Sequence, residues 1–249
     1  MITIISPSKT QDFNKSTFNK WTIPRQFNES LKLINELKKL TKDEIAKLMK
    51  LSAKLAELNY ERFQNFQKEC TINNAKQAIL AFKGDVYQGF EINDYDDQDF
   101  EFAQNNLCIL SGLYGVLKPL DLIQPYRLEM GTNLKNSLGK NLYQFWGTSI
   151  SEVINKIETK VIINLASNEY FKAIDKKALL ANIITVDFKE NKNGSFKTIG
   201  IYAKKARGLM ANYMIKNRIN NPEKLKKFTL NNYQFNLHLS TENNWVFTR

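Results

Sequence analysis

In the segment Ile2-Thr3-Ile4-Ile5-Ser6-Pro7-Ser8-Lys9-Thr10, an apolar run leads directly into a polar loop. The apolar, β-branched first half of this segment predicts a short buried strand, and Ser6-Pro7 ends that strand. The loop that follows is small and polar and carries one lysine, Lys9. Because loops at the ends of buried strands often hold ligands, we expect this loop to be a binding segment.

The same arrangement of strand and loop occurs twice more along the chain. The apolar runs 107–110 and 161–165 predict buried strands, and the polar or glycine-containing loops 111–115 and 167–169 follow them. If the three strands lie side by side, their loops form a crevice outside the strand ends, where open α/β sheets bind ligands. Each loop taken alone is also compatible with an ordinary turn.

Three helices are predicted between residues 29 and 66. Residues 29–40 have apolar positions at a helical spacing, and Thr41-Lys42-Asp43-Glu44 fits a capping box that starts a second helix through Lys50. Ser52 is the expected N-cap of the third helix. The second and third helices are therefore joined by a very short connection.

This connection is similar to the hairpin of a helix-hairpin-helix element, placed here near residues 41–66. Lys50 and Ser52 stand where that motif has glycines, so an ordinary helical pair is the alternative. In the motif, backbone N–H groups at a helix N-terminus hold a DNA phosphate. Lys50, Ser52 and Lys54 are the residues expected to do so here.

The remaining segments predict one domain over residues 1–249 in the α/β class (mixed α+β), a mixed sheet surrounded by helices. Residues 75–82 predict a strand that leads into a glycine-punctuated loop, and Asn193-Gly194 predicts a hairpin turn. The second arm of this hairpin is expected from Phe196 to Tyr202, and a helix that carries Lys204 is expected after it, through about Asn217. No Pro/Gly/Ser-rich linker or internal repeat divides the chain.

Composition excludes several classes of protein. The chain has 249 residues, of which 43% are hydrophobic, but it has no apolar run long enough for a membrane helix or a signal peptide. With two cysteines and one histidine, zinc fingers, histidine-rich metal centres and disulfide frameworks are not expected. The acidic segment 94–101 predicts a solvated turn and a helix start. We expect a cytoplasmic protein without a membrane partner, a bound metal or a cofactor.

The charge is asymmetric. The net charge is +11, and residues 1–124 hold 16 basic and 16 acidic residues, so residues 125–249 carry all of it. A basic half favours a polyanionic partner such as nucleic acid or a phosphorylated ligand. A genome that favours lysine and asparagine codons is the alternative explanation for this charge.

Several charged residues stand beside glycines or aromatic residues rather than in solvated runs. Arginine suits bidentate phosphate recognition, and lysine supplies a point charge. Without a set of histidines, acid–base work would fall to a carboxylate, a lysine or a tyrosine. The candidate anion-binding residues outside the helical pair are Lys9, Lys83, Arg127, Lys204, Lys205 and Arg207, and the candidate catalytic residues are Lys9, Asp85 and Glu129.

Six segments, in order along nearly the whole chain, give it a resemblance to the YaaA peroxide stress protein family (UPF0246-type). They are ISPSKT (5–10), AILAFKGDVY (78–87), LSGLYGVL (110–117), QPYRLEMG (124–131), INLAS (163–167) and YAKKARGLM (202–210). The resemblance implies the mixed α/β "cantaloupe" fold, a positively charged cleft and a helix-hairpin-helix element that binds DNA. It also implies a cytoplasmic role in peroxide stress that lowers unincorporated intracellular iron.

Two functions remain open at this point. The first is a stress protein that binds the phosphate backbone of double-stranded or structured DNA. The second is an enzyme that acts on a phosphorylated or nucleotide-like small molecule in the same basic cleft. Affinity that falls steeply with salt would favour the first function, because many phosphate contacts release many counterions.

Overall fold

A mixed β-sheet forms the centre of the computed structural model, which describes residues 1–16, 18–157 and 160–249. Its strands follow the order β11-β12-β9-β8-β1-β5-β6, and β10 pairs with β9 outside this path. The strands of this sheet are β1 (Ile2–Ile5), β5 (Leu107–Ser111), β6 (Gly115–Leu117), β8 (Val161–Asn164), β9 (Asn182–Lys192), β10 (Ser195–Lys197), β11 (Gln234–Phe235) and β12 (Asn244–Thr248).

The central strands run parallel, so their carboxyl ends meet at one edge of the sheet. Strand β1 pairs in parallel with both β5 and β8, with Ile4 opposite Cys108 on one side and opposite Asn164 on the other. Strands β8, β9 and β12 continue the parallel part, whereas β6 and β11 pair antiparallel at the two ends. The sequence prediction of a mixed α/β fold is confirmed.

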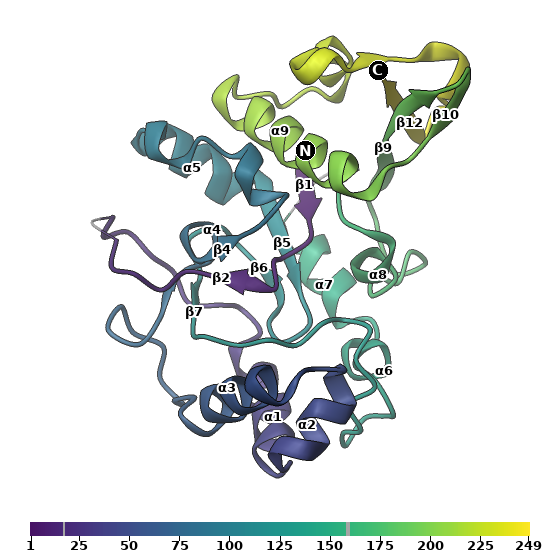
Figure 1. Cartoon of the computed structure of the whole chain (residues 1–249). Coiled ribbons are helices and arrows are strands. Elements are labelled where there is room, and N and C mark those ends of the chain that lie inside the picture. Colours follow the sequence, from purple (N-terminus) through teal and green to yellow (C-terminus); the bar gives the residue numbers. More distant parts are fainter. Residues whose placement is uncertain (17, 158–159) are drawn as a thin grey trace.

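Helices and short strand pairs surround this sheet (Figure 1). Helices α1, α2 and α3 lie together at one end of the molecule, and α9 lies at the other end beside β9 and β12. The helices are α1 (Phe27–Lys38), α2 (Lys42–Met49), α3 (Ala53–Gln64), α4 (Ala78–Ala81), α5 (Asp97–Asn106), α6 (Leu142–Trp146), α7 (Ser149–Asn155), α8 (Asn168–Phe171) and α9 (Gly200–Lys216). The short strands β2 (Thr10–Gln11) and β4 (Phe82–Lys83) pair with each other, as do β3 (Lys76–Gln77) and β7 (Leu122–Ile123).

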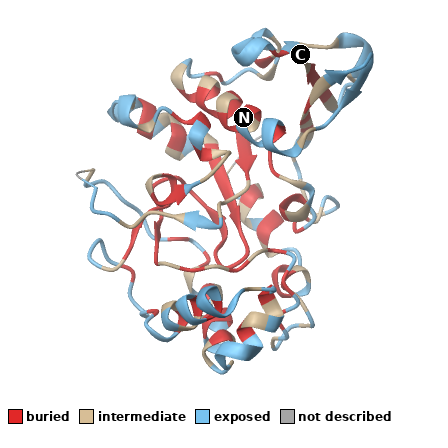
Figure 2. Cartoon of the chain, viewed as in Figure 1, coloured by how far each residue is buried: buried red, intermediate tan, exposed pale blue. Residues whose placement is uncertain are grey.

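The core is continuous around β1 and β5, where every residue of both strands is buried (Figure 2). This explains why these strands read as uninterrupted apolar runs rather than as alternating patterns, because helices cover both faces of a parallel sheet. Within the described residues, no helix is both long and apolar enough to cross a membrane.

Local sequence rules were right at several turns. Thr41 and Glu44 form the predicted capping box at the start of α2, and Asn193 and Gly194 adopt positive φ in the turn between β9 and β10. The second hairpin arm, predicted from Phe196 to Tyr202, is wrong beyond Lys197, because β10 ends there and α9 begins at Gly200.

The strand predicted over residues 75–82 is wrong in its middle. Lys76 and Gln77 pair with β7, but Ala78–Ala81 forms a helical turn before β4. The N–H of Ala78 donates to the carbonyl of Asp121 at 2.8 Å, and the N–H of Ile79 donates to the carbonyl of Pro119 at 3.0 Å. These bonds to a distant segment replace the strand ladder, and local propensity does not report them.

The predicted helical pair is present, with α2 and α3 joined through residues 50–52. Lys50 ends α2 in the left-handed conformation at φ 52°, and Ser52 occupies the N-cap of α3. The Ser52 side chain, however, accepts no capping hydrogen bond. The left-handed conformation at Lys50 is one that glycine adopts more easily, which agrees with the glycine that the motif has there.

Candidate functional site

The loops after β1 and β8 lie next to each other at the carboxyl edge of the sheet. The Ser167 N–H donates to Ser6 Oγ at 2.9 Å, and the hydroxyls of these two serines are 3.3 Å apart. The buried Tyr87 hydroxyl donates to the Ser6 carbonyl at 3.1 Å and fixes the first loop from the other side. The crevice predicted from strand ends is therefore formed by two of the three predicted loops.

The third predicted loop, residues 111–115, does not open to this crevice. Ser111 is fully buried, and its Oγ accepts the N–H groups of Leu113 and Tyr114 and bonds the Tyr126 hydroxyl. Because β6 folds back antiparallel on β5, this turn is packed inside the protein. The prediction that it holds a ligand is thus wrong.

A cavity of about 630 Å³ occupies the carboxyl edge, and we call it the strand-end cleft. Its volume is within the range of roughly 300–1,000 Å³ that is typical of small-molecule sites. The residues that line it are Ser6, Pro7, Ser8, Lys9, Thr10, Gly84, Asp85, Val86, Tyr87, Leu165, Ser167, Asn168, Glu169, Tyr170, Lys204 and Arg207.

Helix α9 reaches the cleft through a close contact between Gly89 and Gly208. A Cβ on Gly89, in the short 3₁₀ helix Tyr87–Gly89, would lie 2.4 Å from the backbone nitrogen of Leu209 in α9. Only glycine permits so close an approach of two backbones. The contact holds the 84–89 loop against α9 and brings Asp85 from the loop together with Lys204 and Arg207 from the helix.

Glu129 is the centre of a small ion network beside the cleft. Its Oε1 lies 2.9 Å from Lys9 Nζ and 3.0 Å from the Arg127 guanidinium. Burial raises the pKa of Glu129, but the hydrogen bonds from Lys9 and Arg127 outweigh it, so the pKa lies below its usual value. Glu129 is therefore ionised at neutral pH and suits the role of a base or a counter-ion better than that of an acid.

The charged residues Asp85, Lys204 and Arg207, which line the cleft, are paired more weakly than Glu129 is. Lys204 Nζ is 3.9 Å from Asp85, at the limit of an ion pair. The Arg207 Nε is buried and has no hydrogen-bond partner among the described residues. Burial lowers the pKa of Arg207, with an opposing contribution from Asp187. Arg207 also lines the cleft, and the part of its guanidinium that faces the cleft can donate to an anion there.

The predicted site residues divide into three groups. Lys9, Asp85, Lys204 and Arg207 line the cleft, and Arg127 and Glu129 adjoin it in a small pocket that Lys9 also lines. Lys83 and Lys205 are exposed and do not line it, although each is next to a residue that does. Lys50, Ser52 and Lys54 are exposed on the helical pair, at the opposite end of the molecule from α9 (Figure 1).

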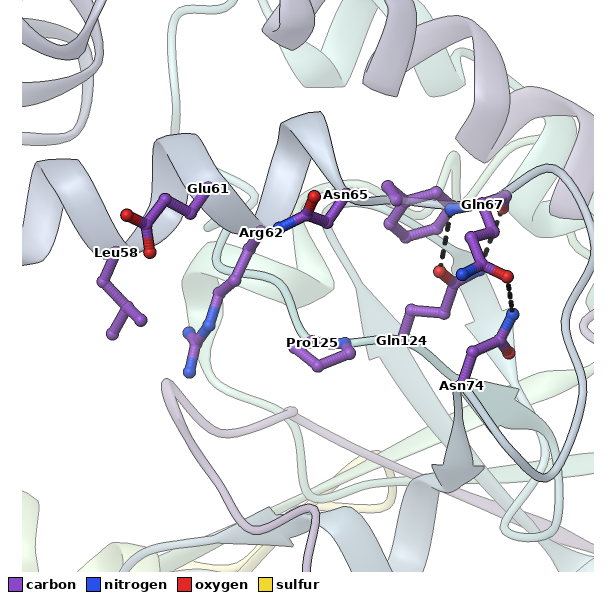
Figure 3. A pocket seen from close by; sticks show the side chains of 9 residues that line it. Leu58, Glu61, Arg62, Asn65, Gln67, Asn74, Gln124 and Pro125 are labelled. Atoms are coloured by element: carbon purple, nitrogen blue, oxygen red, sulfur yellow. Dashed lines mark hydrogen bonds between the residues drawn. The ribbon is translucent and has the colours of Figure 1, made fainter.

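One cationic residue that the sequence analysis did not consider, Arg62, lies in a second pocket of about 300 Å³ beside α3 (Figure 3). The only feature of Arg62 visible in the sequence is its place in a helical spacing, so no pattern could have selected it. We call this cavity the α3 pocket. Its lining residues are Leu58, Glu61, Arg62, Asn65, Phe66, Gln67, Asn74, Gln124 and Pro125.

The cysteines and the acidic segment are occupied structurally. Burial raises the pKa of Cys70 to about 12 and also raises that of Cys108, so both thiols stay protonated and are poor nucleophiles. In the acidic segment, Asp99 is buried, not solvated as predicted, and it pairs with Lys216 at 2.7 Å and with Arg218 at 3.2 Å.

Fold and site together define a mixed α/β protein with a cleft at the carboxyl ends of its parallel strands, lined by three basic side chains and two carboxylates. The chain belongs to the YaaA peroxide stress protein family, whose model matches residues 1–239. It is 53% identical to a UPF0246 protein of Acaryochloris marina over 100% of both chains. It is 52% identical to a UPF0246 protein of Colwellia psychrerythraea over 100% of this chain and 99% of the relative. The family resemblance seen in the sequence is thereby confirmed.

Proposed function

We propose that this peroxide stress protein binds the phosphate backbone of DNA through the strand-end cleft. The observation that carries the proposal is the convergence of Lys9, Lys204 and Arg207 on one cavity, with Arg207 lacking a carboxylate partner among the described residues. Asp187 acts on Arg207 through its charge but forms no direct ion pair with it, so an anion in the cleft would supply the contact that Arg207 lacks. No base-reading arrangement is needed for contacts of this kind.

The exposed helical pair supports a second contact with the same duplex. Its connection presents Lys50, Ser52 and Lys54 to solvent, and the backbone N–H of Ser52 has no hydrogen-bond partner among the described residues. Free N–H groups at a helix N-terminus and neighbouring lysines suit a phosphate. In this proposal the helical pair and the cleft contact different parts of one polyanion.

An enzyme that acts on a phosphorylated or nucleotide-like small molecule is the second candidate. The size of the cleft and the ionised Glu129 between Lys9 and Arg127 favour it, because a surface that only coats DNA needs neither. In such an enzyme Glu129 would be the base and Arg207 would hold the phosphate.

Salt dependence of binding separates these two functions. For DNA, the double variant Lys204→Gln with Arg207→Gln should flatten the slope of log K against log salt by about 0.9 for each phosphate that the protein no longer neutralises. The variant Lys205→Gln measures how much an exposed basic residue outside the cleft adds to DNA affinity. The control for a simple change of charge is Lys140→Gln, because Lys140 is an exposed residue next to α6.

Unchanged slope and affinity in the folded double variant would remove DNA from the cleft. Binding of a nucleoside monophosphate with a shallow salt slope, abolished in the same variant, would establish the second function instead. Both measurements use the full chain and need only purified protein.

We propose further that the protein lowers unincorporated iron indirectly rather than by storing it. Fe(II) and peroxide together damage DNA, so binding DNA and lowering iron would act against the same injury. Asp99 and Asp97, which belong to the acidic segment 94–101, already pair with Lys216 and Lys20. Equilibrium dialysis of Fe(II) with the purified protein tests this, and stoichiometric, tight binding would contradict it.

A further inference from the structure

The α3 pocket contains a cation, Arg62, that forms no ion pair with any described residue, although Glu61 also lines the pocket. Arg62 is half-buried, and among residues 1–16, 18–157 and 160–249 its guanidinium has only a long hydrogen bond, 3.4 Å, to Asn59 Oδ1. Its neighbour Glu61 turns its carboxylate toward Leu58 and away from the guanidinium (Figure 3). Burying a guanidinium without a carboxylate costs free energy that a bound anion would recover.

The charge of a second guanidinium, that of Arg127, acts on Arg62, although Arg127 does not line the α3 pocket. Burial lowers the pKa of Arg62, and the positive charge of Arg127 lowers it further. Arg127 stands just beyond Pro125, which lines the α3 pocket, so residues 124–129 pass from this pocket to the ion network of Glu129. The carboxylate of Glu129 is shared between Lys9 and Arg127. Its single negative charge therefore balances only one of the two positive charges of Lys9 and Arg127.

The wall of the pocket is rigid before any ligand arrives. Gln124 accepts the N–H of Gln67 at 2.9 Å and donates to its carbonyl at 2.9 Å, and Asn74 donates to Gln67 Oε1 at 2.6 Å (Figure 3). These amides bond one another and the backbone, so they shape the site. A preorganised wall lowers the entropy cost of binding.

The remaining lining indicates what the ligand carries besides its charge. Phe66 and Pro125 are apolar, Leu58 is 40% exposed at the mouth, and the side-chain amide of Asn65 has no partner among the described residues. A cavity of about 300 Å³ is at the small end of ligand sites and suits a body of sugar size. The guanidinium of Arg62 suits a phosphate monoester, whose oxygens can accept two parallel hydrogen bonds from it.

We propose that the α3 pocket binds a small phosphate monoester, with the phosphate on Arg62 and a sugar-sized body against Leu58 and Pro125. Asn65 donates to or accepts from a hydroxyl of that body. This site is separate from the strand-end cleft and does not depend on the function proposed for the cleft. It makes the protein responsive to a phosphorylated small molecule as well as to a polyanion.

The test is calorimetric titration of the full chain with ribose 5-phosphate at physiological salt, beside ribose and inorganic phosphate. Ribose 5-phosphate should bind, ribose should not, and inorganic phosphate should bind more weakly. Arg62→Gln should weaken binding about tenfold or more, because it removes a charge-assisted fork. Leu58→Trp should weaken it comparably by filling the mouth, without any change in charge.

Lys68→Gln is the matched control, an exposed lysine in the same loop that does not line the pocket. The proposal is overturned if wild type does not bind ribose 5-phosphate, if Arg62→Gln binds it as tightly as wild type, or if Lys68→Gln loses as much affinity. Equal affinity for ribose and ribose 5-phosphate also overturns it. Thermal unfolding of every variant, including the conservative variant Arg62→Lys, shows whether a loss of affinity for ribose 5-phosphate reflects misfolding. DNA binding that persists when ribose 5-phosphate does not bind leaves the proposed function of the cleft intact.

Discussion

Gly208 of α9 is in backbone contact with Val86, so that a Cβ on Gly208 would lie 1.8 Å from the Val86 carbonyl oxygen. No side chain can move to relieve this contact, because the opposing atom belongs to the backbone. The pair joins α9 to the 84–89 loop, and residues of both elements line the strand-end cleft.

The first prediction concerns this contact. Gly208→Ala should lower the free energy of unfolding by about 3 kcal/mol, at the upper end of the cost of overpacking, and should separate Lys204 from Asp85. Urea unfolding measures the loss. Gly200→Ala is the control, because a Cβ on Gly200 would meet no atom within 4 Å and the φ of Gly200 is ordinary. That variant should be neutral or slightly stabilising, and equal losses in both variants would show that the contact is unimportant.

How far the sequence predicts this site depends on the range of each interaction. The strand Ile2–Ile5 and the capping box of Thr41 and Glu44 are local features, and both were predicted. The bond between Lys9 and Glu129 joins segments far apart in the chain, so the sequence could nominate each residue but not their pairing.

Two other outcomes show where local rules fail. Residues 78–81 are helical because they bond the distant segment 119–121, although their apolar composition suits a strand. Arg62 belongs to a helix that looks ordinary in the sequence, and its burial in the folded chain, with the charge of Arg127 as a smaller cause, makes it unusual. Electrostatic features of this kind appear only once tertiary contacts are known.

The second prediction concerns the buried carboxylate of Asp99. Asp99→Asn should cost about 1.5–3 kcal/mol, the worth of hydrogen bonds to charged groups, because the amide cannot hold Lys216 and Arg218 in the same way. Asp97→Asn is the matched control, since its pair with Lys20 is exposed and exposed pairs contribute about 0–1 kcal/mol. Similar losses in both variants would contradict the role assigned to burial.

The same carboxylate predicts a dependence of stability on pH. Burial raises the pKa of Asp99, but the hydrogen bonds from Lys216 and the Asp96 backbone, with the charge of Arg218, lower it more, and the net pKa is below its usual value. The stabilisation is therefore present above the pKa of the unfolded chain, about 3.9, and is lost as pH falls through the lower folded value. The difference in stability between wild type and Asp99→Asn should accordingly shrink below about pH 4. A constant difference down to about pH 3 would argue against it.

The third prediction concerns Glu129. If the cleft binds a polyanion, Glu129→Gln should strengthen DNA binding, because Lys9 and Arg127 lose their shared counter-ion. The salt slope should then steepen by about 0.9 for each additional phosphate that these side chains neutralise. An enzyme that uses Glu129 as its base would instead lose turnover while still binding its substrate. Filter binding at several salt concentrations gives both the affinity and the slope. Weaker DNA binding by a folded Glu129→Gln variant would count against DNA as the ligand of the cleft.

The fourth prediction concerns Lys50, whose left-handed conformation lets backbone and charge be tested apart. In the left-handed conformation a residue with a Cβ carries a steric cost of roughly 1–2 kcal/mol that glycine does not have. Glycine loses more chain entropy on folding, which offsets part of this gain. Lys50→Gly should therefore raise the free energy of unfolding by up to about 1 kcal/mol. Lys50→Glu keeps the conformational cost and reverses the charge, so it should weaken DNA binding without a large change in thermal unfolding. If the backbone holds the phosphate, Lys50→Gly should bind almost as well as wild type.

The companion variant Ser52→Pro removes a single donor from the same connection. Ser52 has φ −66°, which proline adopts, and its N–H has no partner among the described residues, so the fold should tolerate the change. Ser52→Gly retains the donor and should bind DNA as wild type does, whereas Ser52→Pro should bind more weakly. We would compare duplex affinity and thermal unfolding for all four variants. If Lys50→Glu and Ser52→Pro both fold and bind as wild type does, α2 and α3 are only a helical corner, and any DNA affinity must come from the cleft.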